Sequence, residues 1–546
     1  MMKKVLLCFC VVAFWACTQN FDEGDLVDVP QEQTTAVSQT QEEMGNPIVL
    51  GEKLNNPYSL KNMQGAYDSI QKKSSMRRVG ALKLEPTHYY VRFLPKDTAD
   101  FNKLWRDSLE LFDYPLDYEV ESWGDYYHDP SIPEDQPTWQ YTKVPVGYKF
   151  PEVQYEILDE CFIPEDEDEC EDESEDVKVK MRKAKRMVDL GDLERMAFIV
   201  SGNEDMLEPT NNTPEGMKKA LKKRPSGTFR VYNNTTGQWE GVAGVRLRIT
   251  NLLKWFNVQT DENGYYSTSK YFLVKKVHYA MIFENAKGFN IGSRCVIANA
   301  RVHEMGWHSS KGYNYDFWTT SSMWSHCVVN NSAYYMYKNF KDYMPNNMVL
   351  WVVNNTSTGC AAMLHHATAV HWKKFVNVVT LGVINLFIIV CLAPDIIVGA
   401  KGKSYYDLCE TTCHELSHAM HFKKVGIDYW DKYIDGILYC WMKSSNNIYG
   451  TSSTTYEYSG HIGVGETFGY AMGYYMADKK CNRNWGAYKN DEYWFKWRKS
   501  YDILYIGKLT PLQFLDCMDS NTTNLTKLGT NLHKKNSNIS SNLYTK

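Results

Sequence analysis

The sequence predicts a multidomain α+β protein with a small N-terminal α+β domain, a β-sandwich in the middle and a mainly α-helical C-terminal domain. Its 546 residues correspond to three or four units at about 150 residues per domain. Residues 225–300 contain alternating apolar and polar residues around Gly-containing turns, which is typical of β-strands. Several segments after residue 320 instead have apolar residues at helical spacing.

Residues 1–17 are typical of a bacterial secretion signal. Lys3 and Lys4 precede a short apolar run, and Ala16 provides the small residue expected before a cleavage site. The run is too short for a permanent membrane span. Ala16-Cys17 resembles the end of a lipoprotein box, which implies lipidation of Cys17 and anchoring to a membrane. An ordinary soluble secreted protein is the alternative.

Residues 18–80 are predicted to be a tether, because they are rich in Gln, Glu, Asp, Thr and Asn and offer little apolar surface. The acidic residues Asp22, Glu23 and Asp25 resemble the surface-export signal of Bacteroidetes lipoproteins. This resemblance implies a lipid-anchored protein at the outer membrane or cell surface.

Residues 81–158 predict the small α+β domain, with a strand at 88–95 and a helix at 98–112. Residues 159–190 combine an acidic run with a basic patch and are predicted to be a solvated linker. A calcium loop is disfavoured there, because the alternating ligands and the turn glycine are missing. Cys161 and Cys170 could form a disulfide across the acidic run.

Two stretches of the β-rich segment 225–300 carry a resemblance to a known domain family. Gly241 to Val245, followed by Thr260, Asp261 and Gly264 to Tyr266, resembles the carboxypeptidase regulatory-like domain. That resemblance implies a transthyretin-type β-sandwich that serves as a spacer or binding module and carries no catalysis.

Residues 301–525 form the predicted C-terminal domain, and residues 526–546 a flexible tail. A helix is expected at 321–344. The apolar segment 376–400 predicts a buried helix followed by a strand at 395–398, with a membrane span as the alternative. Three histidines in 365–371 leave a second metal site open, whereas His303 and His308 are expected to be supporting or surface groups.

The motif His-Glu-x-x-His, formed by His414, Glu415 and His418, lies in a helix predicted at 407–424. Residues four apart share a helix face, so both imidazoles can bind one metal ion. Glu415 can then act as general base towards a metal-bound water. Cys409 and Cys413, next to the motif, are expected to pack rather than bind metal.

A catalytic zinc site needs a third protein ligand. The metzincin continuation requires Gly and His where this chain has His421 and Lys424, which excludes that family. Glu457, His461 and Glu466 remain open. Glu466 is preferred, because a carboxylate in the first turn of an otherwise apolar helix needs a positive partner.

The pairing of HELSHAMHF with a later VGE-x-x-x-Tyr helix resembles a group of Bacteroidetes lipoproteins with a gluzincin-like metallopeptidase core. The resemblance implies a zincin-like C-terminal domain in which His414, His418 and Glu466 hold Zn²⁺. Glu415 would take a proton from the bound water and pass it to the leaving amine. His461 or Tyr470 could stabilise the transition state.

The predicted function is therefore that of a surface-anchored zinc-dependent metallopeptidase, which hydrolyses peptide bonds in extracellular proteins or peptides. The alternative is a non-catalytic surface lipoprotein that binds glycans or peptides, which the 38 Tyr and 16 Trp would suit. With a net charge of −5 and no basic stripe, a nucleic-acid partner is not expected.

Overall fold

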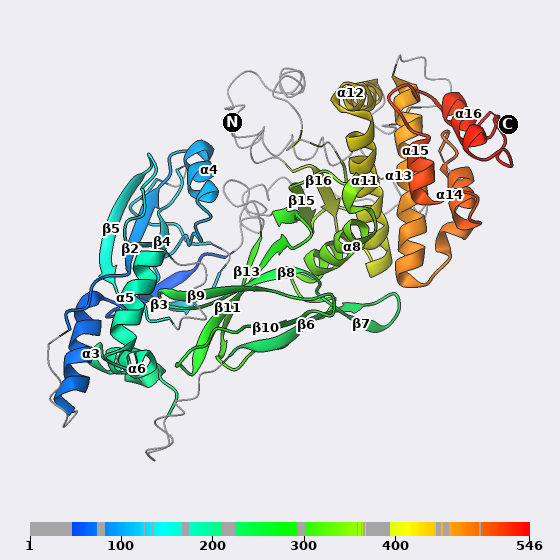
Figure 1. Ribbon diagram of the computed structural model, residues 1–546. Helices are drawn as coiled ribbons and strands as arrows, with labels where there is room; N and C mark the ends of the chain where they lie inside the picture. Colours follow the sequence, from blue (N-terminus) through cyan, green and yellow to red (C-terminus); the bar gives the residue numbers. More distant parts are fainter. Residues whose placement is uncertain are drawn as a thin grey trace, which may run out of the picture.

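The computed structural model shows a multidomain protein of mixed helices and sheets with a helical C-terminal region (Figure 1). Among the residues it describes, no helix is both long and apolar enough to cross a bilayer. The predicted signal segment and Cys17 lie outside the described residues. The structure describes residues 46–73, 82–124, 126–133, 136–165, 174–209, 224–292, 301–357, 359–361, 363, 366, 394–443, 449–450, 458–490 and 493–545.

The N-terminal part contains a three-stranded antiparallel sheet in the order β4-β2-β5, with helix α4 beside it. The strand predicted at 88–95 and the first part of the helix predicted at 98–112 are both present. Alternate residues of β2, such as Val91 and Phe93, are fully buried together with Leu104 of α4, as the period of two requires. The bounds are β2 (His88–Leu94), α4 (Thr98–Arg106), β4 (Gln140–Pro145) and β5 (Gln154–Cys161).

The predicted tether ends earlier than residue 80. Strand β1 (Val49–Lys53) pairs with β3 (Tyr118–Ser122), and helix α3 (Leu60–Lys73) follows. Met63, Ala66 and Tyr67 of α3 are at most 1% exposed. Their spacing of three and four residues places them on one helix face. The composition of residues 18–80 does not indicate this apolar face, because polar residues dominate the rest of the segment.

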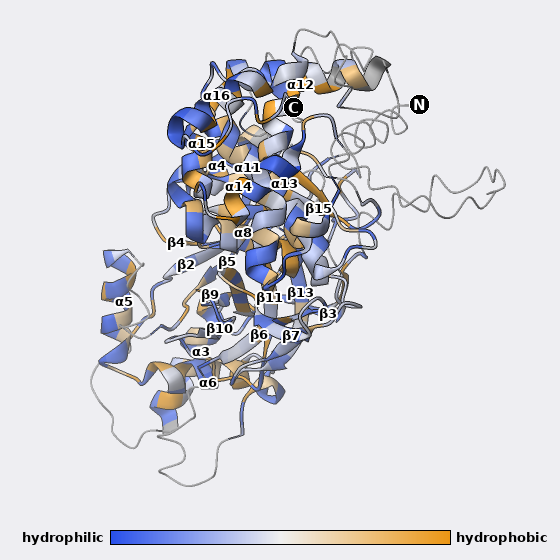
Figure 2. Ribbon diagram, turned by 90° about the vertical axis from the view of Figure 1, so that its right-hand side faces the viewer, coloured by the Kyte–Doolittle hydropathy of each residue, from blue (hydrophilic) through white to orange (hydrophobic). Residues whose placement is uncertain are grey.

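The predicted linker at 159–190 is also partly folded. Its basic patch forms helix α5 (Glu175–Lys185), which buries Val177, Met181 and Ala184, and α6 (Leu190–Val200) starts at its end. Hydrophobic and hydrophilic residues alternate along these helices (Figure 2). The charged residues of α5 therefore lie on the solvent-exposed face of a helix and do not belong to an unstructured linker. Cys161 is buried, and its suggested partner Cys170 lies outside the described residues.

The middle of the chain forms two sheets. The smaller has the order β10-β6-β14, and β7 pairs with β6. The larger has the order β16-β15-β12-β11-β8-β9, and β13 also pairs with β11. The bounds are β6 (Ser226–Asn233), β7 (Gln238–Gly241), β8 (Val245–Asn251), β9 (Lys254–Gln259), β10 (Tyr265–Ser267), β11 (Lys276–Asn285), β12 (Phe289–Gly292), β13 (Val302–Ser309), β14 (Tyr315–Phe317), β15 (Met348–Val353) and β16 (Ile396–Gly399).

The boundary predicted at residue 300 falls inside both sheets. β13 and β14 return to strands of the 225–300 segment, and β15 and β16 extend the larger sheet in parallel. Pairing between strands that are far apart in the sequence leaves no local pattern. The pattern of residues 225–300 alone therefore predicts a complete domain. β16 nevertheless matches the strand predicted at 395–398, whereas the helix predicted before it lies outside the described residues.

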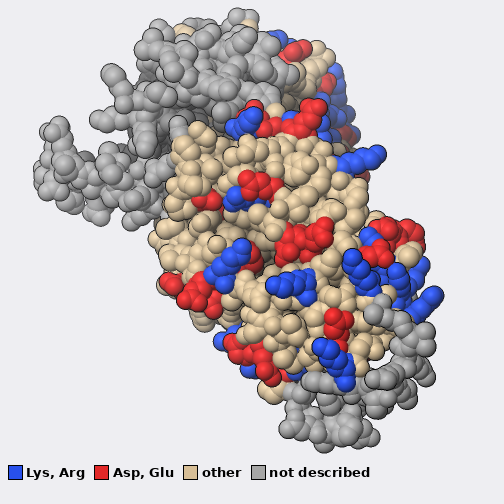
Figure 3. Space-filling model, turned by 90° about the vertical axis from the view of Figure 1, so that its left-hand side faces the viewer, with Lys and Arg blue, Asp and Glu red and all other residues tan. Residues whose placement is uncertain are grey.

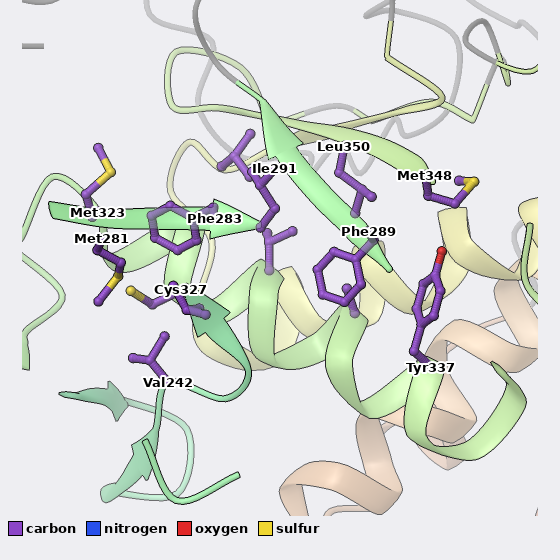
Figure 4. Packing of buried hydrophobic residues seen from close by; sticks show 14 of the residues in the cluster. Val242, Met281, Phe283, Phe289, Ile291, Met323, Cys327, Tyr337, Met348 and Leu350 are labelled. Atoms are coloured by element: carbon purple, nitrogen blue, oxygen red, sulfur yellow. The ribbon is translucent and has the colours of Figure 1, made fainter. Parts of the chain in front are cut away.

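Helix α8 (Trp324–Phe340) connects the two middle sheets to the helical region. It matches the helix predicted at 321–344. Cys327 and Tyr337 of α8 pack among side chains of β11, β12 and β15, including Phe283, Phe289 and Leu350 (Figure 4). α8 also packs against the motif helix, so the sheet and the candidate site share one core.

The C-terminal region is helical as predicted (Figure 1). The predicted flexible tail is wrong, because α16 buries Leu528 and Leu532, and Ile539 and Tyr544 beyond it are also buried. Its abundance of Asn, Ser and Lys concealed these apolar positions. The bounds are α11 (Tyr405–Val425), α12 (Ile427–Lys443), α13 (Ser459–Cys481), α14 (Trp497–Tyr505), α15 (Pro511–Asp516) and α16 (Leu525–Lys535).

A buried charge network joins the N-terminal part to the larger sheet. Arg248 of β8 donates to Glu110 at 3.1 Å and to Glu304 of β13 at 3.3 Å, and its side chain is 4% exposed. Arg246 also donates to Glu110. Elsewhere, on the described part of the face in Figure 3, acidic and basic side chains are interspersed rather than separated by sign.

Candidate metal centre

The motif helix α11 begins and ends at residues suited to those positions. Ser404 and Asp407 form a capping box, in which each side chain accepts a hydrogen bond from the other residue's backbone N–H. Gly426 ends the helix with φ = 81°, a conformation that glycine adopts without strain. Both ends of α11 lie within two residues of the ends of the predicted helix, 407–424.

Helix α13 packs side by side with α11 (Figure 1). Gly469 makes this close approach possible, because a Cβ there would lie 2.9 Å from His418 Nε2 and 3.1 Å from His414 Cε1. The position of Glu466 was predicted wrongly. α13 begins at Ser459, so Glu466 lies two turns inside the helix rather than in its first turn. The low helix propensity of glycine disfavours a helix at Gly460, Gly463 and Gly465, but tertiary packing overrides this preference.

Three side chains from these two helices converge on one point. His414 Nε2 and His418 Nε2 are 3.0 Å apart. Glu466 Oε2 lies 3.5 Å from His414 Nε2, and Glu466 Oε1 lies 3.6 Å from His418 Nε2. All three residues are at most 1% exposed. They are the one group of three or more possible metal ligands found among the described residues.

The spacing of these atoms fits a metal ion. Ligand atoms that lie about 2.0–2.1 Å from a tetrahedral zinc ion are about 3.3 Å from one another. The observed separations of 3.0, 3.5 and 3.6 Å scatter around that value. Two imidazoles and one carboxylate can therefore hold a metal ion, and the donor set leaves a fourth position for a small ligand.

The electrostatics of the site favour a neutral His414 beside an anionic Glu466. Burial lowers the pKa of His414 to about 4, despite the opposing effect of Glu466. Burial alone would raise the pKa of Glu466, but His418 and His414 outweigh it and hold that pKa well below its ordinary value. Near neutral pH the site thus presents the neutral imidazole of His414 and the carboxylate of Glu466, the forms that bind metal.

Glu415 lies beside this group, with its carboxylate buried. Neither oxygen makes a hydrogen bond within the part of the chain that the structure describes. Burial and the charge of Glu466 raise its pKa well above the ordinary value, whereas Lys403 lowers it. A Cβ on Gly359 would lie 3.0 Å from Glu415 Oε1, so the backbone there approaches the carboxylate closely. A buried carboxylate without a donor needs either a cation or a proton.

Tyr433 of α12 is a functional candidate that the sequence did not reveal. Its hydroxyl donates a short hydrogen bond to Glu466 Oε1, and its ring stacks on Trp430 at 4.5 Å between centroids. Gly465 accommodates the ring, because a Cβ there would lie 2.9 Å from Tyr433 Cε2. In the sequence, Gly465 directly before Glu466 is the indication that another side chain packs closely at this point. Such donors fix the orientation of a ligating carboxylate.

Comparison of the chain with protein-family models, with curated proteins and with solved structures finds no match. The function therefore has to be inferred from the chemistry of the site itself.

The other ligand candidates take different positions. His461 contacts Tyr429, with ring centroids 4.5 Å apart, and is not part of the converging group. Glu457 lies outside the described residues. Tyr470 is close to the group, since its ring lies edge-on to His414 at 4.5 Å. Its hydroxyl is 3.3 Å from that of Tyr449. Of the two predicted transition-state donors, only Tyr470 contacts the group.

His366, His308 and the two cysteines near the motif have structural contacts. His366 bonds to Asp395 at 2.8 Å through Nδ1, and its two neighbours in the predicted second metal site lie outside the described residues. His308 stacks on Tyr313 at 3.5 Å. Cys409 and Cys413 are buried with their sulfur atoms 4.0 Å apart, on a face that packs in the core.

Proposed function

We propose that this protein is a zinc-dependent metallopeptidase with a gluzincin-like arrangement of residues. The proposal includes anchoring at the outer membrane or cell surface through Cys17, and action on extracellular proteins or peptides. Its main support is the convergence of His414, His418 and Glu466 from two helices, with the carboxylate of Glu415 beside them. Helices packed only for stability would not need two imidazoles and two carboxylates buried together, with both oxygens of Glu415 lacking a hydrogen bond among the described residues.

The donor set favours zinc over the harder divalent cations. Two imidazoles and one carboxylate are a usual set for catalytic zinc, whereas Mg²⁺ and Ca²⁺ prefer oxygen ligands. When bound, zinc supplies Lewis acidity, which lowers the pKa of a coordinated water and polarises a carbonyl group. His414 and His418 would each contribute a ring nitrogen, and Glu466 is held in place by the hydroxyl of Tyr433.

Glu415 has the part of general base and acid in this proposal. Its carboxylate takes the proton from the attacking water and delivers it to the leaving amine. Lys403 provides a positive charge near this carboxylate, and its Nζ donates to Thr411 Oγ1 at 2.6 Å, one turn before Glu415. The lysine opposes in part the rise in the pKa of Glu415 that burial and Glu466 cause, and the positive charge of a bound metal would act in the same direction as the lysine.

The decisive experiment combines elemental analysis with hydrolysis of casein by wild type and Glu415→Gln. Wild type is expected to hold one zinc ion per chain and to cleave casein. Glu415→Gln should keep the zinc and lose at least about a hundredfold in activity. Equal cleavage by both proteins would refute the mechanism, and wild type that binds no zinc would overturn the site and the activity together.

Two further variants identify the third ligand. Glu466→Ala should lose zinc, because it removes one of three converging atoms, whereas Glu457→Ala should keep it. Circular dichroism serves to show that both variants are folded. The reverse outcome, with zinc lost only in Glu457→Ala, would move the ligand to that residue.

A further inference from the structure

A surface groove of about 340 Å³ lies away from the candidate metal centre. Its lining comes mainly from four separate parts of the chain: strand β7, the turn between β9 and β10, helix α8 and helix α13. In Figure 1, β7 reaches beneath the lower ends of these helices. The volume is at the small end of the range of about 300–1,000 Å³ that is typical of small-molecule sites.

One wall of the groove holds a carboxylate in a fixed position. Glu240 of β7 accepts hydrogen bonds from Lys480 Nζ at 2.8 Å, from the Tyr405 hydroxyl at 2.8 Å and from Asn233 Nδ2 at 2.7 Å. Burial opposes ionisation, but Lys480 and the other donors hold the pKa of Glu240 below its ordinary value. This wall therefore presents an immobile acceptor beside an immobile ammonium group.

The other wall carries a second ion pair, between Lys338 of α8 and Glu262 in the β9–β10 turn. Both side chains are more than half exposed. The charged residues that line the groove are thus two carboxylates and two ammonium groups, already paired with each other. A charged ligand would have to break one of these pairs or keep an unbalanced charge, so the groove favours a neutral ligand.

Aromatic rings provide the remaining surface. Trp239, Tyr334 and Tyr335 line the groove and are partly exposed. Beyond Trp239 the aromatic surface continues, since its ring contacts Tyr232 at 5.2 Å and Trp318 at 4.6 Å. Trp318 is 51% exposed. An aromatic strip that leads out of a small polar groove suits a ligand longer than the groove itself.

We propose that this groove and strip bind a neutral oligosaccharide. A sugar ring has apolar C–H faces that pack on Trp and Tyr rings, and hydroxyl groups that bond to fixed carboxylates and ammonium groups. One sugar unit occupies the groove against Tyr334 and Tyr335, and the following units lie over Trp239 and Trp318. Glu240 accepts from a sugar hydroxyl, and Lys480 donates to another.

This site is separate from the candidate metal centre. Lys480 follows Glu466 by fourteen residues on α13, which corresponds to about 21 Å along the helix axis. Binding of a glycan would hold the protein on a glycosylated target or on a polysaccharide. It does not depend on metal, so its failure and the failure of the proposed peptidase activity can be told apart.

The test is calorimetric titration of the purified full-length protein, in EDTA, with maltotriose, cellotriose, mannotriose and N,N′-diacetylchitobiose. Sialyllactose, a heparin disaccharide and one acidic and one basic peptide serve as charged probes. At least one neutral probe is expected to bind, with Kd between micromolar and low millimolar. Trp239→Ala and Tyr334→Ala should each weaken that binding by about tenfold, because each removes one stacking surface.

Tyr488→Ala is the matched control, since Tyr488 is 77% exposed and does not line the groove. It should bind as wild type does. The proposal is overturned if no neutral probe binds at low-millimolar concentration, if only charged probes bind, or if Trp239→Ala and Tyr334→Ala both bind like wild type.

Discussion

Gly469→Ala is the substitution whose effect can be worked out most directly from the structure. The new Cβ would lie 2.9 Å from His418 Nε2, 3.0 Å from His418 Cε1 and 3.1 Å from His414 Cε1. Comfortable contact between such atoms begins near 3.5 Å, so the two imidazoles must retreat by about 0.5 Å. Metal sites tolerate deviations of about 0.2 Å in ligand distance. The substitution should therefore damage metal binding without removing any ligand.

The expected loss is about 10- to 100-fold in zinc affinity, which corresponds to about 1.4–2.8 kcal/mol. The stability of the metal-free protein should change less. Alanine in a helix interior gains about 0.5–1 kcal/mol over glycine, whereas overpacking costs about 1–3 kcal/mol. The free energy of unfolding in EDTA should thus fall by no more than about 2.5 kcal/mol.

The assay is a competition titration of zinc against a chromophoric chelator, together with urea unfolding in EDTA. Gly65→Ala is the control, because a Cβ at this position in α3 meets only Val200 Cγ1, at 3.4 Å. It should gain about 0.5–1 kcal/mol in stability and keep the zinc affinity. A folded Gly469→Ala protein that binds zinc within about twofold of wild type would refute the placement of the metal between these helices.

Three further predictions concern the surroundings of the site. Tyr433→Phe should lower zinc affinity by about tenfold in the same titration, because the ring stays stacked while Glu466 loses its donor; unchanged affinity would exclude an orienting role. Burial, with smaller effects of nearby histidines, lowers the pKa of His421 from 6.5 to about 3 in the folded protein. Between these two pH values the unfolded chain binds a proton that the folded chain does not, so the stability falls as the pH falls. The unfolding free energy of His421→Phe relative to wild type, measured in EDTA, should therefore rise from pH 7 to pH 4 by up to about 1.4 kcal/mol per unit, and a difference independent of pH would contradict this pKa. Gly426→Ala should cost about 1 kcal/mol in urea unfolding, since φ is 81° there; no loss would mean that the helix end can rearrange.

The motif helix could be predicted from the sequence because its signals are local. His414 and His418 are four residues apart, and Ser404 and Gly426 mark the helix ends. The strand at 88–94 was equally clear from its alternation. Glu466 was identified as a candidate by an argument of the same kind, because a single carboxylate interrupts an apolar helix.

The features that were missed depend on contacts between distant residues. At the glycine-rich start of α13, Gly463 and Gly465 allow Trp494 and Tyr433 to pack closely, and this packing offsets the low helix propensity of glycine. The pairing of β15 and β16 with the middle strands has no local pattern. The apolar faces of α3, α5 and α16 are an exception, because their spacing is local; polar residues outnumber apolar ones in these helices, and this composition dominated the prediction.

The buried charge network at Arg248 has a consequence for dividing the protein into parts. A shortened chain that begins near residue 225, at the start of the predicted sandwich, would lack Glu110, one of the two carboxylates that face this 4% exposed guanidinium. The loss of this partner is destabilising as long as the guanidinium stays buried, because its charge is then compensated by Glu304 alone. The N-terminal part therefore acts as an internal counterion for the central sheet. Studies of the metal centre should retain it.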